Sequence, residues 1–438
     1  MTKDKKQIID LEERVSLLMQ QIAELQSENI MLRNRLSIYE TKKDSSNSSL
    51  PPSRDLNRLG RTESLREKSG KKAGGQIGHS GSFLQMVSNP TEIIELRPCY
   101  CQSCGKDLSD TASDYIGRRQ LIDIPPIKPV IKEYHLYSKQ CNCGHITSSQ
   151  YPSEVNSSVC YGNNIQGLTA YFHARQYIPY ERMQELYSDV FGLSISSGCL
   201  VKMIQTFANK ATGIYEIIAR RVSQSLVIGA DETGNRMNGK NGWAWVFQTP
   251  DATYIHSDKS RGRAVIDKLF PNGFTKSILV HDCYSSYFSI KTKEHQICIA
   301  HLLRDLKYIG KLYPDQQWIT NFTNLLHQAL ELKKNLSPQD YSQTIPQRII
   351  LEKNLDDLLE QKINYQYEKL ITFKERILRY RKHLFTFLYY QKVPPDNNAS
   401  ERAVRTFKVK QKVSGLFRSD KGSETFAIIR SIIDTTIK

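Results

Sequence analysis

The sequence has no apolar run that approaches the roughly 18 residues of a membrane-spanning helix. Its first six residues, Met-Thr-Lys-Asp-Lys-Lys, carry charges with no apolar segment behind them, so we expect no secretory signal peptide. These two absences predict a cytoplasmic protein with no membrane partner. At 438 residues the chain is long enough for two or three domains.

Acidic residues are in the minority. Asp and Glu number 45 against 61 Lys and Arg, which gives a net charge of +16 at pH 7. Basic groups gain affinity for nucleic acids by releasing condensed counterions from the phosphates. The charge balance therefore predicts a polyanionic partner such as DNA, although a merely soluble basic surface has the same composition.

Cysteines are few, and their number, nine, is odd. Disulfides are not expected in a cytoplasmic chain. Five of the nine lie in two short groups, Cys99-Tyr-Cys101-Gln-Ser-Cys104-Gly and Cys141-Asn-Cys143-Gly-His145. Two cysteine pairs, each followed by glycine, predict two knuckles whose four thiolates suit a tetrahedral, structural Zn²⁺. The expected ligands are Cys101, Cys104, Cys141 and Cys143, with Cys99 and His145 as substitutes.

The segment 83–155, which holds these groups, is predicted to be a zinc-binding module. Strand-forming residues from Val130 to Tyr137 predict a hairpin between the knuckles. Free thiols, buried as small apolar side chains, are the alternative. The remaining cysteines are scattered and are expected to be core or surface thiols: Cys160, Cys199, Cys283 and Cys298.

A seven-residue repeat runs through residues 8–39, inside a predicted N-terminal helix over 1–40. Its two seam positions hold Ile8, Val15, Ile22, Asn29 and Leu36, and Leu11, Leu18, Leu25, Leu32 and Tyr39. β-branched residues at the first position with leucine at the second favour a parallel two-stranded coiled coil, and a seam asparagine fixes its register. We therefore predict a homodimer through 8–39; an amphipathic helix packed within one chain is the alternative.

Residues 41–82 hold few apolar residues and many Ser, Pro and Gly, which predicts a linker. From Lys42 to Lys72 it carries nine Lys/Arg and four Asp/Glu, so it either follows a phosphate backbone or is simply solvated. Residues 156–222 are predicted to be helical, with a Gly/Ser turn and a capping serine within 191–198. This DNA-binding or connecting region resembles a helix-turn-helix in outline, an outline shared by ordinary packed helices.

Residues 223–302 are rich in predicted strands. Five of them are expected at 226–231, 243–247, 253–256, 278–282 and 296–301, with a helix near 263–270. Three strands in a meander, followed by alternating strand and helix, are the order of a ribonuclease-H-like α/β domain, in which the first and fourth strands are neighbours. Those two strands end in Asp231 and Asp282. Paired carboxylates there suit a hard cation such as Mg²⁺.

Residues 303–392 carry helical patterns only, which predicts a helical insertion that ends before Pro394-Pro395. Residues 393–438 are predicted to form a final helix and a truncated C-terminal tail. Glu401 in this helix has two interpretations. With Asn398 as N-cap it occupies the third helical position of a capping box; alternatively it is a third carboxylate beside Asp231 and Asp282. One residue could do both.

In this order, the motifs resemble those of the insertion sequence 66 family of transposases over nearly the whole chain. No single feature is diagnostic, but their joint order is specific. The shared features are the N-terminal zipper, Asn47-Ser-Ser-Leu-Pro-Pro-Ser53, Gly74-Gly-Gln-Ile-Gly-His79, the two knuckles, Asp231-Glu-Thr233, Trp243-Ala-Trp245, Asp282 with Tyr284 and Tyr287, Ala300-His301, and Asn397-Asn398 through Glu401-Arg402.

Two features depart from the family pattern. Leu302-Leu303 follows His301 where the family often has a basic pair, and the chain ends at Lys438, whereas such transposases usually continue further past the Glu401 helix.

The resemblance implies a DDE transposase of an insertion sequence, which cleaves DNA ends and transfers the strands. It implies that Asp231, Asp282 and Glu401 bind two Mg²⁺ ions, for which Mn²⁺ can substitute, and that His301 and Arg402 help to position substrate. Implied partners are terminal inverted repeats, target DNA and helper proteins of the same element, in a bacterial cytoplasm and on the nucleoid when DNA is bound. A metal-dependent nuclease of the same fold, and a catalytically inactive or truncated DNA-binding regulator, are the alternatives.

Overall fold

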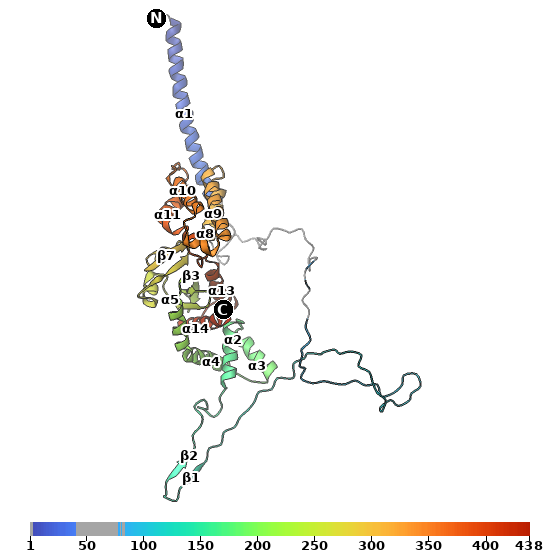
Figure 1. The fold of residues 1–438 in the computed structure, drawn as a ribbon. Helices are drawn as coiled ribbons and strands as arrows, with labels where there is room; N and C mark the ends of the chain where they lie inside the picture. The colour runs from blue at the N-terminus through green and yellow to red at the C-terminus, as the bar shows by residue number, and fades with distance from the viewer. Residues whose placement is uncertain (1–2, 41–77, 79, 81–83) are drawn as a thin grey trace.

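The computed structural model describes residues 3–40, 78, 80 and 84–438. A long helix, α1 (Lys3–Glu40), projects from one end of a mixed α/β body, and a small hairpin lies at the other end (Figure 1). The predicted linker over 41–82 lies outside the described residues, apart from Gly78 and Ser80. Within the described part of the chain, no helix combines the length and the apolarity that crossing a membrane requires.

The body is built on a five-stranded sheet with the order β5-β4-β3-β6-β7. β3, β4 and β5 are antiparallel neighbours, whereas β6 runs parallel to β3 and β7 runs parallel to β6. The predicted adjacency of the first and fourth strands of this block is thus confirmed. The strands are β3 (Val227–Met237), β4 (Lys240–Gln248), β5 (Thr253–Asp258), β6 (Phe274–His281) and β7 (Thr292–Ile297).

Helices cover both faces of the sheet because its inner strands are apolar on both sides. In β4, Trp245 and Phe247 pack toward α5 (Thr212–Ser223) and α6 (Arg263–Leu269). Ala244 and Val246, which alternate with them, pack toward α13 (Asn398–Ser414) and α14 (Asp420–Ile437). This period-2 alternation, with both sets buried, is typical of a sheet enclosed between two helical layers.

A helical block lies beside the β6–β7 edge, between the sheet and α1 (Figure 1). Its residues bury their own core, which is continuous with Ile278 and Val280 of β6. Residues 303–392 are described throughout and contain helices and 3₁₀ turns but no strand. The elements are α8 (Ile299–Leu312), α9 (Gln317–Asn335), α10 (Pro346–Glu360), α11 (Glu368–Arg379), α12 (Thr386–Tyr389) and the 3₁₀ turns Pro338–Ser342 and Arg381–His383. The short helix α7 (Ser285–Phe288) joins β6 to β7.

Between the hairpin and α5 the chain forms three further helices: α2 (Asn163–Ala174), α3 (Tyr180–Phe191) and α4 (Ser197–Lys210). The predicted turn is present, with Gly192 at φ +64°. Ser196 caps α4, because its side chain accepts a hydrogen bond from the backbone N–H of Cys199. Helices α3 and α4 bury Tyr187 and Leu200, respectively, in a shared apolar cluster.

Two expected strands differ from the structure. The fifth strand occupies Thr292–Ile297 instead of 296–301, so His301 lies in helix α8. The backbone N–H of Ile299 donates to the carbonyl of Pro395, which turns the chain out of the sheet; an apolar run alone cannot distinguish a strand end from a buried helix start. The hairpin expected over Val130–Tyr137 forms instead as β1 (Ser138–Gln140) and β2 (Ile146–Ser148), around the second cysteine knuckle.

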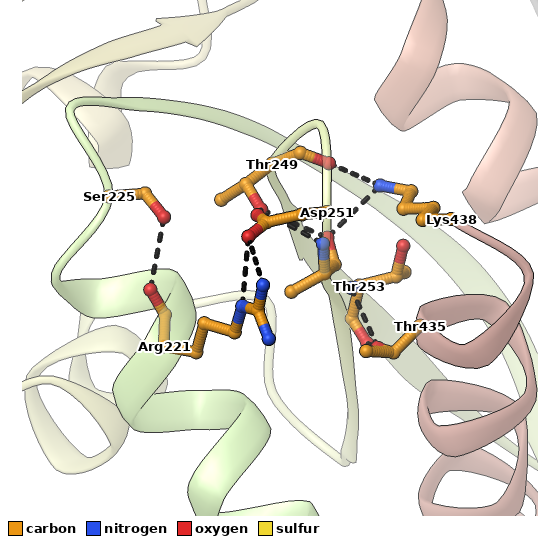
Figure 2. A network of polar contacts seen from close by, with 8 residues as sticks. Arg221, Ser225, Thr249, Asp251, Thr253, Thr435 and Lys438 are labelled. Atoms are coloured by element: carbon orange, nitrogen blue, oxygen red, sulfur yellow. Dashed lines mark hydrogen bonds and ion pairs between the residues drawn. The ribbon is translucent and has the colours of Figure 1, made fainter.

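Helix α14 was not predicted, because residues 393–438 were expected to end in a tail. It buries Phe426 and Ile429 against the sheet and is tied to the β4–β5 turn by polar contacts (Figure 2). The backbone N–H of Thr253 donates to Thr435 Oγ1 at 3.0 Å, and Lys438 Nζ donates to the carbonyl of Ala252 at 3.0 Å. Beside them, Arg221 of α5 forms an ion pair with Asp251 at 2.5 Å.

Candidate active site

Asp231 and Asp282 lie on neighbouring parallel strands. Gly229 of β3 pairs with Val280 of β6, so two residues further along both strands Asp231 is level with Asp282. Asp231 continues in β3, where it is opposite Val246 of β4, whereas Asp282 directly follows the last residue of β6. Both side chains are partly exposed. The sequence pattern thus identified two acids that the sheet brings to one level.

Asp231 and its neighbour Glu232 point to opposite faces of the sheet. Successive side chains of a strand alternate, and Ile228 and Ala230, of the same parity as Glu232, pack toward α5 and α6. Asp231 shares the other face with Gly229, which lies under the start of α13. Asp282 has the parity of Ile278 and Val280, which pack toward the helical block. Asp231 and Asp282 therefore share a face with α13.

Glu401 lies in the first turn of α13, and the capping-box interpretation of this residue is wrong. The N-cap is Asn397 rather than Asn398, and it makes no side-chain cap hydrogen bond. Glu401 Oε1 instead accepts a hydrogen bond from Arg304 Nη2 of α8 at 2.7 Å. The carboxylate is mostly buried, at 17% exposure, and lies 3.6 Å from His301 Nδ1.

Asn397 fastens this helix to β3 and to the junction of β7 and α8. Its Nδ2 donates to the carbonyl of Ala230 at 2.6 Å, immediately before Asp231. Its backbone N–H donates to Cys298 Sγ at 3.2 Å, at the junction of β7 and α8. Its carbonyl accepts from the backbone N–H of Glu401 at 3.1 Å. A single buried amide residue therefore fixes Glu401 relative to Asp231.

The close approach of α13 to β3 requires a glycine at position 229. A Cβ there would meet Ser400 Oγ, and it would lie 2.7 Å from Gln248 Nε2 and 3.0 Å from Asn397 Oδ1. Real Cβ atoms almost never lie this close to other heavy atoms. Ser400 and Asn397 are themselves buried, so neither can easily move aside.

Burial and the charges of neighbouring acids raise the pKa values of Asp231 and Asp282. Burial, followed by the charges of Glu232, Asp282 and Glu401, raises the pKa of Asp231 well above its ordinary value. Burial and then Glu232 raise the pKa of Asp282 to about 6, although Arg261 and Arg376 act in the opposite direction. Acids that destabilise one another's charged forms are stabilised by a bound cation. The site thus has the charge and the hard oxygen donors for divalent metal ions.

A further acid near the site, Glu232, has partners for both of its carboxylate oxygens within the protein. Arg261 Nη2 donates to Glu232 Oε1 at 2.6 Å, and Tyr287 Oη donates to Glu232 Oε2 at 2.5 Å. The Arg261 guanidinium lies 4.0 Å from the ring centre of Tyr284 and 4.8 Å from that of Trp243. Glu232 is only 2% exposed, whereas Arg261 is 42% exposed.

The expected ligands are not drawn together into one tight cluster. In the described residues, the group of three or more His, Cys, Asp or Glu ligand atoms within 4.8 Å of one another is Cys298, His301 and Glu401. Asp231 and Asp282 are outside this group. Arg402, the other secondary candidate, is exposed on α13 and contributes to the electrostatic environment of Lys438.

The cysteine groups adopt knuckle-like turns, although their thiols do not form a single cluster. Gly105 and Gly144, which follow the cysteine pairs, have φ of +71° and +88°. The backbone N–H of Gly105 donates to the carbonyl of Cys101, and that of Gly144 to the carbonyl of Cys141. Hydrogen bonds from the Cys104 and Cys143 backbones are the largest causes that lower the pKa values of Cys101 and Cys141, respectively. The spare candidates Cys99 and His145 are exposed.

Several contributors to the site were missed from the sequence. The spacing of Cys298 and His301, three residues apart, was an available signal, because residues so spaced share a face once a helix begins between them. Arg261, Tyr287 and Asn397 gave no local signal of their roles, since each acts through a partner distant in the chain.

Comparison with known proteins gave one family match. The model of the family described as "Transposase IS66 family" matches residues 158–425, which include the sheet, the helical block and α13. A search of curated proteins found no match.

We predict that Gly229→Ala lowers the free energy of unfolding by ~1–3 kcal/mol, because the methyl group forces the start of α13 away from β3. Gly213→Ala is the matched control, since nothing lies within 4 Å of a Cβ at that position in α5. Urea unfolding of the two variants and the wild type measures the difference. Equal stability of the two variants would show that α13 retreats from β3 without cost.

We predict that Asp282 destabilises the cation-free protein as pH rises. Its folded pKa, about 6, exceeds its ordinary value of 3.8, so the stability present below pH 4 is lost between pH 4 and 6, by about 3 kcal/mol. Asp282→Asn removes this loss, which unfolding measurements without divalent cations at pH 4, 5, 6 and 7 detect. Asp251→Asn is the control: the pKa of Asp251 is lowered, so its removal should not abolish a loss of stability with rising pH. An identical pH dependence in wild type and Asp282→Asn contradicts the prediction.

Proposed function

Because the chain belongs to the IS66 family of transposases, we propose that it is the DDE transposase of an insertion sequence, and that Asp231, Asp282 and Glu401 hold two Mg²⁺ ions for DNA end cleavage and strand transfer. Family membership supports an enzyme that acts on DNA with divalent metal. The triad, the ions and the two reaction steps are the parts that we propose.

The observation that carries the proposal is the convergence of three acids from separate segments. β3, the end of β6 and the first turn of α13 supply them, and the charges of Asp282 and Glu401 both raise the pKa of Asp231. Such repulsion between carboxylates does not stabilise the protein. Acids that lie within one another's influence despite it therefore suggest a cation site. The carboxylate oxygens match the preference of Mg²⁺ for hard ligands.

The sheet supports the ribonuclease-H-like assignment. An antiparallel meander of β3, β4 and β5, extended by the parallel strands β6 and β7 beside β3, is the strand arrangement expected for that domain. In this arrangement α13 packs on β3 and β4, on the face that carries Asp231. Glu401, in the first turn of α13, therefore lies on the same side of the sheet as Asp231. The helical block over 303–392 is then an insertion between the sheet and the last catalytic helix.

The chain's own residues have distinct roles in the proposed reaction. When bound, Mg²⁺ supplies activation of the attacking water and stabilisation of the leaving 3′-oxygen. Asp231, Asp282 and Glu401 would together hold the ions, with Asp231 under the electrostatic influence of both other acids. In strand transfer a freed 3′-hydroxyl would take the place of water: it would lose its proton and form a P–O bond to a phosphate of target DNA, while the bond from that phosphorus to the target's own 3′-oxygen would break. His301 and Arg402 are proposed to position the DNA strands.

Dimerisation through residues 8–39 is supported by exposed seam residues of α1. In the single chain, Leu18 is 55% exposed, Leu25 64% and Leu32 54%. Exposed leucines spaced by seven residues on one helix match the seam of a two-stranded coiled coil, which a second copy of α1 would bury. A dimer would present two active sites, one for each end of the element.

A zinc module over 83–155 is supported by the two knuckle turns and by the lack of any core in that segment. Nearly all of its described side chains are exposed, including Leu96 at 91% and Ile116 at 100%. Small modules with so little burial are typically stabilised by metal. Together with the basic linker and the α3–α4 pair, the module is a candidate for DNA contact.

We predict that Asp231→Asn binds DNA and folds like the wild type but abolishes cleavage, because an amide removes one charge from the central metal ligand. The assay uses Mg²⁺, helper proteins of the element, and labelled DNA with the element's own ends. Asp251→Asn, at the β4–β5 turn (Figure 2), should cleave like the wild type. Binding without cutting in the wild type would favour a regulatory protein, and cutting without joining would favour a nuclease.

We predict that Leu18→Glu combined with Leu25→Glu converts the dimer to a monomer, because four carboxylates would then face one another across the seam. Leu17→Glu with Ile30→Glu is the matched control: these side chains are 58% and 44% exposed but lie off the seam. Sedimentation equilibrium gives the molecular mass of each variant. A control that also dissociates, or a seam variant that stays dimeric, argues against this coiled coil.

A further inference from the structure

We propose that Cys298, His301 and Glu401 form a second metal site, which takes Zn²⁺ or a similarly thiophilic divalent ion and withdraws Glu401 from the Mg²⁺ site. Binding of the ion stands on the geometry of these three residues alone. Its inhibitory consequence rests on the proposed transposase function.

The three donors converge from two segments of the chain. A carboxylate oxygen of Glu401, a ring nitrogen of His301 and Sγ of Cys298 all lie within 4.8 Å of one another. Cys298 is the N-cap of α8, and His301 is in its first turn, so both face the start of α13. Cys298 is fully buried, whereas His301 and Glu401 are 16% and 17% exposed, which leaves an approach for an ion from their side.

An unpartnered nitrogen points into this group. His301 Nδ1 is buried and has no hydrogen-bond partner. Its nearest charged neighbour is Glu401 Oε1, at 3.6 Å, which is too far for a hydrogen bond. Leaving a buried polar atom unpaired costs ~1–3 kcal/mol. A cation between the imidazole nitrogen, the carboxylate and the thiolate would use a lone pair from each.

The donor set selects the ion. Sulfur and imidazole ligands favour Zn²⁺ and its relatives, whereas Mg²⁺ takes oxygen ligands almost exclusively. This group is therefore distinct in chemistry from Asp231 and Asp282, although it shares Glu401 with them. An ion held by Cys298 and His301 would orient the Glu401 carboxylate toward α8, and its positive charge would lie beside a bound Mg²⁺, so we expect the two sites to compete.

Binding of the ion releases one proton, from the Cys298 thiol, and breaks one hydrogen bond, between Arg304 and Glu401. The S–H bond of Cys298 breaks, its proton passes to solvent, and a metal–sulfur bond forms, without any change of oxidation state. The backbone N–H of Asn397, 3.2 Å from Sγ, stabilises the resulting thiolate. Arg304 Nη2 releases Glu401 Oε1, while Arg304 Nε keeps its bond to the carbonyl of Ala300 at 3.2 Å.

The test is a Cd²⁺ titration of the full chain, followed by the ultraviolet charge-transfer band of cadmium thiolates. The cysteine knuckles contribute equally in every variant. We expect the band of the wild type to exceed that of Cys298→Ser by the amplitude of one thiolate. Cys283→Ser is the matched control, because Cys283 is a partly buried thiol that packs against the core of the helical block and is outside the group. Equal amplitudes for wild type and Cys298→Ser overturn the proposal.

Because Cys298 is fully buried, its serine variant could fail to fold, which circular dichroism detects. His301→Gln then decides, since it changes a partly exposed helical residue. We expect it to require at least about tenfold more Cd²⁺ for the Cys298 part of the band, as removal of even an indirect metal contact has that effect. An unchanged titration excludes His301 as a ligand and overturns the site.

The inhibitory consequence is measured as Mg²⁺-dependent DNA cleavage with and without added Zn²⁺, each protein relative to its own zinc-free rate. We expect Zn²⁺ to inhibit the wild type at concentrations that leave the relative rate of Cys298→Ser unchanged. Equal inhibition of both proteins contradicts the competition for Glu401. A wild type that never cleaves DNA refutes the proposed function instead, and the Cd²⁺ titration still decides whether the site exists.

Discussion

The site depends on one close contact between distant parts of the chain: the start of α13 lies directly on β3. Gly229 makes the room, and the Asn397 side chain bonds to the carbonyl of Ala230. This contact helps to fix Glu401 relative to Asp231, together with the Lys408 side chain, which donates to the carbonyl of Gly234 in β3, and the apolar cluster that Phe407 shares with Val246. Asn397 also reaches Cys298 through its backbone, so the strand, the helical block and the last helices are linked by one buried asparagine.

Around the acids, the protein places arginines at the periphery. Arg261 pairs with Glu232, and Arg304 pairs with Glu401. Arg376 of α11 pairs with Asp305 and lowers the pKa of Asp282. Arg304 and Arg376 both come from the helical block, so the block contributes directly to the electrostatics of the site. No arginine is among the groups that shift the pKa of Asp231. Burial and the charges of neighbouring acids raise that pKa well above its ordinary value.

The sequence predicted those features that local patterns encode. Apolar runs located four of the five strands, and the strand order predicted that Asp231 and Asp282 would be neighbours, because parallel pairing follows from the meander and crossover. It could not separate the two interpretations of Glu401, since a capping glutamate and a metal ligand occupy the same helical turn. The start of α8 was mistaken for a strand because an apolar run has no distinct period when both faces are buried. Cys298, Arg261 and Asn397 act through tertiary partners, which no local pattern reveals.

Helix α14 also supplies side-chain acceptors to the outer strand β5: Ser431 and Thr435 accept hydrogen bonds from the backbone N–H groups of Ile255 and Thr253. β5 ends at residue 258 and α14 spans 420–437, so at typical rates of protein synthesis roughly 10–35 s separate them on the ribosome. During that interval the nascent sheet has an apolar face and a strand edge with nothing to cover them. Until α14 is made, this apolar surface and strand edge are the part of the nascent chain most open to aggregation or to capture by a chaperone.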